Sequence, residues 1–440
     1  MAEFFVSEDP RGSERGGLSS QKSLRLDVYT TTLLVVIHKP PSNQSLIEMC
    51  PGCSRVKFQG IVFAVIFCCS SPVAVAETIS SFFVDLGADV TVRGVTRLPD
   101  GTAMVVGYTG DFEQAKFFEI APNGAEFTSV ELAGLGGRSV ATAVSANGEY
   151  IVGYSQSPGS ADVGEGTVWT RSTNWSAMGV GLDGLLFPSS VVSDVASNGV
   201  AAGDEDGARG AFSWSPTNGR TSLESRFGNG GAIAVSDDGR LFAGLGSLTF
   251  GVASPLLWAG SGMEVLAHPD LAAVVRDMSD NGVYISGFSE TFDPFIFQTF
   301  TNAALWVDSD RRVTENQSAA DYEFMYLLDM DGDPFQGEVT TVSDNGYAFG
   351  GSPEGAFIWH ESFDGVRLLD EWLITEHGIS LPTNPTNVTD VFFDGQNLNL
   401  AVEGSGYFIS TNVAAIPEPS VAVLLIACTA LISFRRLAMV

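Results

Sequence analysis

The chain has 440 residues, enough for one large domain or roughly two to three ordinary ones, and its formal net charge is −30 at pH 7. This acidic balance disfavours DNA and RNA as partners, because nucleic-acid phosphates repel a surface that carries few cations. All five cysteines lie within 50–69 or at position 428, so the segment 77–415 can form neither a disulfide framework nor a thiolate metal site.

Residues 1–48 match none of the repeats found later in the chain. They are mixed in charge and rich in serine, and Met49 stands directly before a segment typical of an export leader. We interpret translation as starting at Met49, which makes residues 1–48 an extension that is not native to the protein. The alternative is a genuine, disordered N-terminal extension.

Residues 49–76 have the three parts of a secretory signal peptide. Two basic residues, Arg55 and Lys57, precede a short apolar run, and a small-x-small cleavage site follows it. The cleavage-site residues are Ala74 and Ala76. This segment predicts export.

One short pattern recurs seven times between residues 77 and 415, and its clearest copy is 143–155. It consists of apolar residues, a turn at Asn-Gly or Asp-Gly, and a short strand closed by a glycine. Asn-Gly favours a two-residue hairpin turn, in which both central residues need φ > 0. The turn glycines, 40 to 64 residues apart, are Gly101, Gly148, Gly199, Gly239, Gly282, Gly346 and Gly395.

The second half of the repeat carries an apolar strand with a tryptophan. Five of the seven tryptophans fall at this place, namely Trp169, Trp214, Trp258, Trp306 and Trp359. A large apolar side chain at a fixed position suits the wedge between neighbouring sheets. We therefore interpret these residues as packing residues, with sugar stacking as the weaker alternative.

Repeats of about 40–50 residues with several short strands are typical of propeller blades. We predict an all-β fold, a seven-bladed β-propeller over residues 77–415. Segment 81–87 resembles the last strand of a unit and 406–410 a unit without its last strand, so we expect the N-terminal strand to complete the C-terminal blade. Six or eight blades stay open, because the longest step has room for another strand pair.

A short amphipathic helix is predicted over residues 368–378. Leu369, Trp372 and Leu373 would lie on one face, and Gly378 would follow the last turn. We expect this helix to pack under the propeller ahead of the last blade.

Residues 416–440 form the last part of the chain. An apolar run, 421–434, predicts a C-terminal transmembrane helix, although it is shorter than the ~20 residues of a stable span. The residues that flank this run are Pro417, Glu418 and Pro419 before it, and Arg435 and Arg436 after it. The arginines would stay on the cytoplasmic side, which suits a transient inner-membrane anchor.

This order of Pro-Glu-Pro, apolar run and terminal arginines resembles the PEP-CTERM sorting signal of Gram-negative bacteria. The resemblance implies export and recognition by an exosortase-type membrane protease. It also implies cleavage near the Pro-Glu-Pro and delivery to the cell surface or the extracellular polymer matrix.

The repeat segment resembles the extracellular HAF-repeat proteins. The matching stretches are 135–137, 141–145, the later Val-Ser-Asp-Asn-Gly copies, the Ala-Phe-x-Trp strands and 372–379. The resemblance implies a surface β-repeat protein. It brings no catalytic residue with it.

The candidate metal ligands are Asp329, Asp331 and Asp333, because alternating aspartates in a loop can direct oxygens at one Ca²⁺. An EF-hand is not indicated, since the glycine comes at the fourth place of the loop, and the alternative is a solvated acidic loop. Apart from Ca²⁺, no cofactor is predicted. The repeat aspartates are interpreted as turn residues that hydrogen-bond their own backbone, and they are Asp237, Asp238, Asp280 and Asp344.

We find no catalytic constellation in the sequence. The histidines of the repeat segment are isolated, and no Gly-x-Ser-x-Gly motif is present. The favoured hypothesis is a non-enzymatic surface or matrix propeller that binds polysaccharide or protein on one face of the ring. The alternative is a secreted glycoside hydrolase or polysaccharide lyase with carboxylates in the central channel. Three or more convergent charged side chains in that channel would favour the enzyme.

Overall fold

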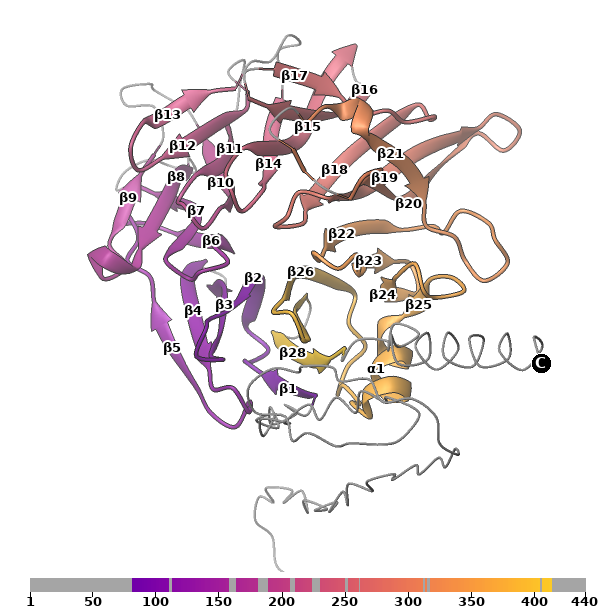
Figure 1. Ribbon diagram of the computed structural model, residues 1–440. Coiled ribbons are helices and arrows are strands. Elements are labelled where there is room, and N and C mark those ends of the chain that lie inside the picture. The colour runs from indigo at the N-terminus through magenta and orange to yellow at the C-terminus, as the bar shows by residue number, and fades with distance from the viewer. Residues whose placement is uncertain are drawn as a thin grey trace, which may run out of the picture. The chain divides into compact units, whose positions relative to one another are not determined.

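The structure, a computed structural model, describes residues 81–413 apart from the short segments 111–112, 158–163, 181–188, 206–209, 224–229, 250–251, 261, 312, 315–316 and 404–405. Its strands form seven four-stranded antiparallel sheets, arranged as the blades of a ring (Figure 1). The all-β, seven-bladed propeller predicted from the repeats is therefore confirmed.

Several predicted features lie outside the described residues. They are the extension 1–48, the leader 49–76 with Ala74 and Ala76, and the segment 416–440 with Pro417, Glu418, Pro419, Arg435 and Arg436. Among the residues that the structure describes, no helix has the length and apolarity needed to cross a membrane.

The first four blades follow the chain in order. Blade 1 comprises β2 (Val90–Arg97), β3 (Ala103–Thr109), β4 (Gln114–Ile120) and β5 (Phe127–Glu131). Blade 2 comprises β6 (Ser139–Val144), β7 (Tyr150–Gln156), β8 (Gly164–Thr170) and β9 (Ala177–Gly179). Blade 3 comprises β10 (Ser190–Val195), β11 (Ala201–Glu205), β12 (Phe212–Ser215) and β13 (Gly219–Ser222). Blade 4 comprises β14 (Gly230–Val235), β15 (Leu241–Thr249), β16 (Val252–Ala259) and β17 (Gly262–Val265).

The last three blades include the two chain ends of the ring. Blade 5 comprises β18 (Ala272–Met278), β19 (Tyr284–Asp293), β20 (Gln298–Asp308) and β21 (Tyr322–Tyr326). Blade 6 comprises β22 (Glu338–Val342), β23 (Ala348–Ser352), β24 (Gly355–Trp359) and β25 (Arg367–Leu368). Blade 7 comprises β26 (Asn387–Phe393), β27 (Asn397–Glu403), β28 (Tyr407–Asn412) and β1 (Phe82–Asp85). Single 3₁₀ turns occur at Arg171–Thr173 and Ala319–Asp321.

The ring closes where the sequence predicted. Strand β1 pairs with β28, with Phe82 opposite Ser410 and Asp85 opposite Tyr407. The first described strand thus supplies the outer strand of the last blade. Ring closure in this way leaves no open blade at the junction between the two ends.

The turn after each inner strand differs from the predicted two-residue hairpin turn. All seven turn glycines have positive φ, from 67° at Gly148 to 92° at Gly395, but the preceding Asn or Asp does not. In blade 2 the Gly148 amide donates to Ser145 O, and the Ser145 amide to Tyr150 O. The side-chain oxygen of Asn147 accepts from the Ser145 hydroxyl and the Glu149 amide, which holds Asn147 in an ordinary conformation.

The glycine that closes the second strand of the repeat has a steric role. It lies opposite the residue that precedes a β-bulge in the inner strand, as Gly153 lies opposite Ala141. A Cβ on Gly153 would stand 1.9 Å from the Val140 carbonyl oxygen, and one on Gly287 would stand equally close to Val274 O. At these positions only glycine fits the close approach of the two strands. Blade 7 is the exception, because Val402 stands opposite Val388 there.

The repeat tryptophans pack between blades, as predicted. Trp169 is fully buried in a cluster with residues of blades 1 and 2, and its indole N–H donates to Ala133 O (2.7 Å). Trp306 is placed in the same way between blades 4 and 5 and donates to Ala267 O (2.7 Å). Burial with a satisfied N–H is the arrangement expected of a structural tryptophan.

Helix α1 (Leu369–His377) confirms the predicted helix. Leu369, Trp372 and Leu373 are buried in a cluster with residues of blades 6 and 7. Gly378 ends the helix at φ 65°, and its amide donates to Ile374 O. The bond from the Gly378 amide to the carbonyl four residues back is that of an αL helix end, and the Ile379 amide donates to Leu373 O.

The longest repeat step contains no additional strand pair among the described residues. Its extra length lies in the long hairpin β19–β20 and in the connection from β21 to β22. The six- and eight-blade alternatives are therefore wrong.

Candidate functional site: the central channel

The seven inner strands, β2, β6, β10, β14, β18, β22 and β26, surround one polar cavity at the centre of the ring. Its volume is about 150 Å³. Sites for small organic ligands usually span ~300–1,000 Å³, so this channel has room for a few waters rather than for a sugar ring.

Each inner strand carries one β-bulge at the same place. The bulged residue does not pair with the second strand, and in all seven blades it lines the cavity. The bulged residues are Arg93, Thr142, Ser193, Ile233, Arg276, Thr340 and Thr389. The bulge therefore aims one chosen side chain per blade at the axis, which is a common use of this feature.

Each of the three bulge threonines links its own blade to the next one. Thr142 donates to Val192 O of blade 3 (2.6 Å), and Thr389 donates to Val92 O of blade 1 (3.2 Å). Thr340 donates in the same way to Val388 O of blade 7. These three hydroxyl groups are therefore used in hydrogen bonds between blades.

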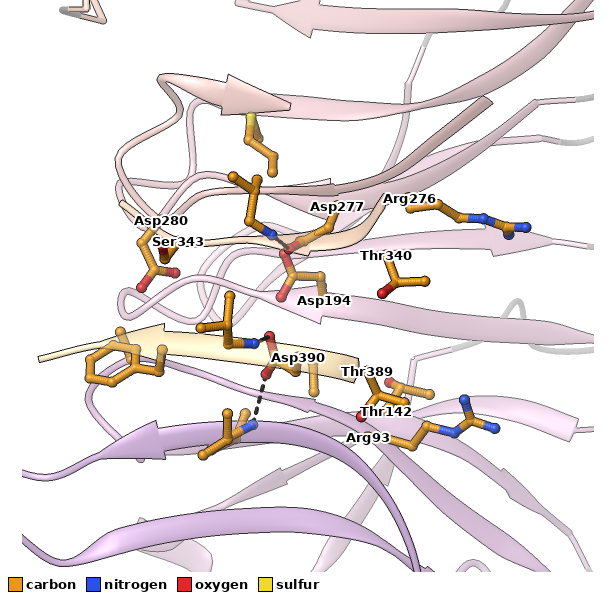
Figure 2. A pocket seen from close by; sticks show the side chains of 18 of the residues that line it. Arg93, Thr142, Asp194, Arg276, Asp277, Asp280, Thr340, Ser343, Thr389 and Asp390 are labelled. Carbon is orange, nitrogen blue, oxygen red and sulfur yellow. Dashed lines mark hydrogen bonds between the residues drawn. The ribbon is translucent and has the colours of Figure 1, made fainter. Parts of the chain in front are cut away.

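Aspartates occupy the position after the bulge in blades 3, 5 and 7. They are Asp194, Asp277 and Asp390, and each lies deep in the channel with limited solvent contact. Figure 2 shows them between Asp280 on one side and the three threonines on the other. Arg93 and Arg276 extend beyond the threonines.

Each of these aspartates bridges two blades. Asp390 accepts from the amide of Val391 (2.8 Å) and from that of Val95 in blade 1 (2.7 Å). Asp194 accepts from Val195 (2.7 Å) and from Val235 in blade 4 (2.8 Å).

Asp277 bridges to blade 6 through a hydroxyl group and an amide. Its Oδ2 accepts from the Thr341 hydroxyl (2.8 Å) and the Val342 amide (3.2 Å). In blade 1 the matching position is Gly94, where a Cβ would come within 3.0 Å of the Ala143 Cα in blade 2. There the two strands already lie too close for a bridging side chain.

The channel raises the pKa of these carboxyl groups. Burial raises the pKa of Asp390 to about 7 and that of Asp194 to about 6, against the opposing effect of the amides that donate to them. Burial, together with the charges of Asp390 and Asp194, raises the pKa of Asp277 well above its usual range. Carboxyl groups that share a poorly hydrated space cannot all ionise easily.

A second group of aspartates lies on the turns at one end of the channel. Asp237 accepts from the Ser197 amide of blade 3 (2.8 Å), and Asp344 from the Asn281 amide of blade 5 (2.7 Å). The predicted bond to their own backbone holds for Asp238, which accepts from the Arg240 amide (3.0 Å). For Asp237 and Asp344 the observed contact is with the neighbouring blade instead. Burial raises the pKa of Asp280 and Asp344.

The other end of the channel carries the two bulge arginines. Arg276 donates to Glu338 of blade 6 (2.9 Å) and lies over the Phe288 ring. Arg93 lies 3.8 Å from Glu403 of blade 7. Both guanidinium groups are thus paired across a blade boundary.

The predicted calcium ligands form a self-contained turn on the β21–β22 connection. Asp329 Oδ1 accepts from the amides of Asp331 (2.9 Å) and Asp333 (3.0 Å), and the latter two side chains are exposed. No group of three acidic, histidine or cysteine side chains in the described part of the chain is placed to hold a metal ion. The solvated-loop alternative accounts for these contacts.

The channel aspartates were missed as a group, although a signal was present. Asp194, Asp277 and Asp390 each stand four residues before the Asn or Asp of the repeat turn. The four other copies have different residues at that place, so the pattern is visible only when copies are compared blade by blade.

No protein-family model matches the chain, and no curated protein sequence matches it. One similar solved structure is YCF48 from Cyanidioschyzon merolae, at 12% identity and a TM-score of 0.46, covering 76% of this chain and 98% of that chain. Another is the WD40 β-propeller domain of Doa1, at 13% identity and 0.41, covering 76% and 95%. TolB from Acinetobacter baumannii matches at 12% identity and 0.35 over 50% of this chain and about half, 52%, of its own length. At these levels the propeller assignment rests on the strand pairing described above, and function has to be argued from the site.

Proposed function

We propose that this chain is an exported, non-enzymatic propeller that serves as a binding or structural protein at the cell surface or in the extracellular matrix. The observation that carries this proposal is the use of the channel side chains. Asp194, Asp277 and Asp390 hold neighbouring blades together, as do the bulge threonines. Side chains whose hydrogen bonds hold neighbouring blades together are poorly placed to act on a substrate.

The proposed location depends on the two end segments. The leader 49–76 supports export, and residues 416–440 support a transient transmembrane anchor and sorting by an exosortase-type protease. Polysaccharide or a surface protein would be the partner at the ring face. The net charge of −30 speaks against nucleic acid as a ligand.

The test is fractionation of a Gram-negative host that contains an exosortase-type protease. We expect the full chain at the cell surface or in the medium, shortened at its C-terminus. A variant with Pro417→Ala and Glu418→Ala should stay in the inner-membrane fraction at full length. Full-length wild-type protein in the cytosol would contradict the proposal, and a variant that is shortened normally would contradict the role of the motif.

A secreted polysaccharide hydrolase or lyase is the second candidate, and one observation favours it. The channel gathers several carboxyl groups, and Asp390, with a pKa of about 7, could donate a proton near neutral pH. The cavity of about 150 Å³ is small for a sugar, which is why we rank this function second.

Assays on neutral and acidic polysaccharides separate the two functions. The enzyme hypothesis expects turnover that falls by about 10²-fold or more in Asp390→Asn and Asp277→Asn, whereas Asp331→Asn, at an exposed site, should keep full activity. Absence of turnover by the folded wild type on the whole panel would support the binding protein.

A further inference from the structure

The hairpin between β19 and β20 extends beyond the rest of blade 5. Pairing of β18 with β19 stops at Glu290, and pairing of β21 with β20 stops at Ala304. The two long strands continue to a tip at residues 294–297 (Figure 1). We call residues 291–300 the blade-5 tip.

The blade-5 tip exposes a cluster of large apolar side chains. Phe295 is 91% exposed and Phe297 80%, while Ile296 and Phe292 are 54% and 48% exposed. Adjacent exposed aromatic residues of this kind mark an interaction site, whereas single exposed apolar residues need no explanation.

The end of the tip contains a strained residue and local side-chain contacts. Phe297 has φ 54°, a conformation that is costly for a bulky residue, and its ring lies edge-on to Phe292 with centroids 6.3 Å apart. The Phe295 amide donates to Asp293 Oδ1 (2.7 Å), and Pro294 has no amide hydrogen.

The tip carries a single charged residue, Asp293. Residues 294–307 contain no Asp, Glu, Lys or Arg, in a chain whose net charge is −30. One acidic residue of the tip, Asp293, directs its carboxylate at the Phe295 amide, and Glu290 lies three residues farther down the strand. A carboxylate this close to the apolar end would be repelled by an anionic surface, so the tip suits a layer whose surface carries no net negative charge.

The size and shape of the tip favour a lipid layer over a protein as its binding partner. A stable protein interface buries about 800 Å² on each partner, more than four side chains on a convex tip can supply. A lipid layer needs no complementary surface, because it deforms around the inserted residues. We propose that the blade-5 tip inserts Phe295, Ile296 and Phe297 into the interface of a zwitterionic lipid bilayer.

The first strand of the described chain begins, and the last one ends, away from the blade-5 tip. Asn412, at the end of β28, lies opposite Asn397, next to the turn at Gly395. The blade-5 tip lies at the other end of its blade, beyond the start of the inner strand β18, where Ala272 pairs with Glu290. The tip and the ends of the described chain thus lie on opposite faces of the ring.

The experiment measures amide hydrogen exchange of the full chain with and without phosphatidylcholine vesicles. Peptides that cover 291–300 should exchange at least about threefold more slowly with vesicles. In the double variant Phe295→Ser/Phe297→Ser this slowing should vanish, because the inserted apolar surface is gone. Exchange at the tip is the readout because apolar segments elsewhere in the chain could bind vesicles independently.

The matched control is Leu328→Ser/Met330→Ser, which removes two exposed apolar side chains from another loop. It should keep the wild-type slowing, and both double variants should unfold at the wild-type temperature. Unchanged exchange at 291–300 while the wild type floats with the vesicles would overturn the proposal. Slowing that appears without vesicles and grows with protein concentration would overturn it as well, since the tip would then meet a second copy. Equal or stronger slowing with anionic phosphatidylglycerol would contradict the charge argument.

Discussion

Aspartate at one position of blades 3, 5 and 7 connects each of these blades to the next one. The carboxylate of Asp390 accepts an amide from its own strand and one from blade 1. It bridges backbone groups that no sheet pairing reaches, at the centre of the ring where seven strands converge. The cost is a carboxyl group in a narrow space, and burial raises its pKa to about 7.

This pKa predicts an unusual pH dependence. A carboxyl group with a raised pKa in the folded state favours folding below its unfolded pKa of ~4, and this contribution is lost as pH rises toward 7. From pH 5 to pH 8 the titration of Asp390 should therefore lower the free energy of unfolding of the wild type by roughly 1–3 kcal/mol. The Asp390→Asn variant should not show this decrease. Urea titrations at both pH values measure it.

Asp331→Asn, at an exposed site, is the control and should keep the wild-type difference between the two pH values. His360 and His377 have pKa values lowered by burial, so they act in the opposite direction below pH ~6.5 in all variants alike. If Asp390→Asn and the wild type show the same pH difference, the proposed protonation of Asp390 is wrong.

The closing glycine of the repeat leads to a second prediction. A Cβ at Gly153 would stand 1.9 Å from Val140 O, so Gly153→Ala must move one strand away from the other. We expect a loss of about 2–4 kcal/mol in the free energy of unfolding, measured by urea titration. Gly219→Ala is the control, because Gly219 has φ 65° and nothing near its Cβ, which leaves a strain cost of only about 1 kcal/mol. Equal losses in the two variants would contradict the steric role.

At the scale of elements, strand β1 carries the closure of the ring. Val84 is 7% exposed and packs with residues of blades 1 and 7, whereas Phe83 points the other way and is 37% exposed. Val84→Asp would bury a charge at the junction and should cost about 3–5 kcal/mol, read from thermal or urea unfolding. Phe83→Ser should cost about 1 kcal/mol or less. A mild effect of Val84→Asp would mean that the ring is stable without β1.

The seven inner strands share one irregularity, the β-bulge. Their bulges occur at one register, so that each blade directs one side chain to the axis, and in blades 3, 5 and 7 the next residue bonds the neighbouring blade. The bulge thus explains the lining of the channel and, in blades 1 to 6, the glycine on the second strand. It is a feature of the pairing between two strands, which no single strand reveals.

At the scale of the whole molecule, the charge of −30 is the dominant property. Self-repulsion of a compact acidic protein weakens when salt shortens the Debye length from ~30 Å at 0.01 M to ~10 Å at 0.1 M. We expect the unfolding temperature to rise by several degrees between 0.01 and 0.3 M NaCl and then to level off. Sucrose of equal osmolality is the control and should give a smaller rise. A temperature that falls with salt would show that attractive ion pairs dominate instead.

Much of the fold follows from local rules. Positive φ at the seven turn glycines, the tryptophan wedges and the helix 369–377 depend on neighbours that are close in sequence or on one apolar face, and all three were predicted correctly. Ring closure also followed, because an unpaired strand at each end of a repeat array has one natural partner. The predicted φ of the Asn before each glycine was wrong, since its side chain already satisfies the turn.

Which side chains meet in the channel, and what their pKa values are, depends on the tertiary structure alone. Asp194 and Asp390 look like turn-flanking polar residues in the sequence, and their partners are amides 41 and 295 residues away. Sequence patterns record what each repeat does by itself. Which groups share a poorly hydrated space, and what their pKa values become, depends on the convergence of seven strands at one axis, because burial and charge repulsion act across distance in space.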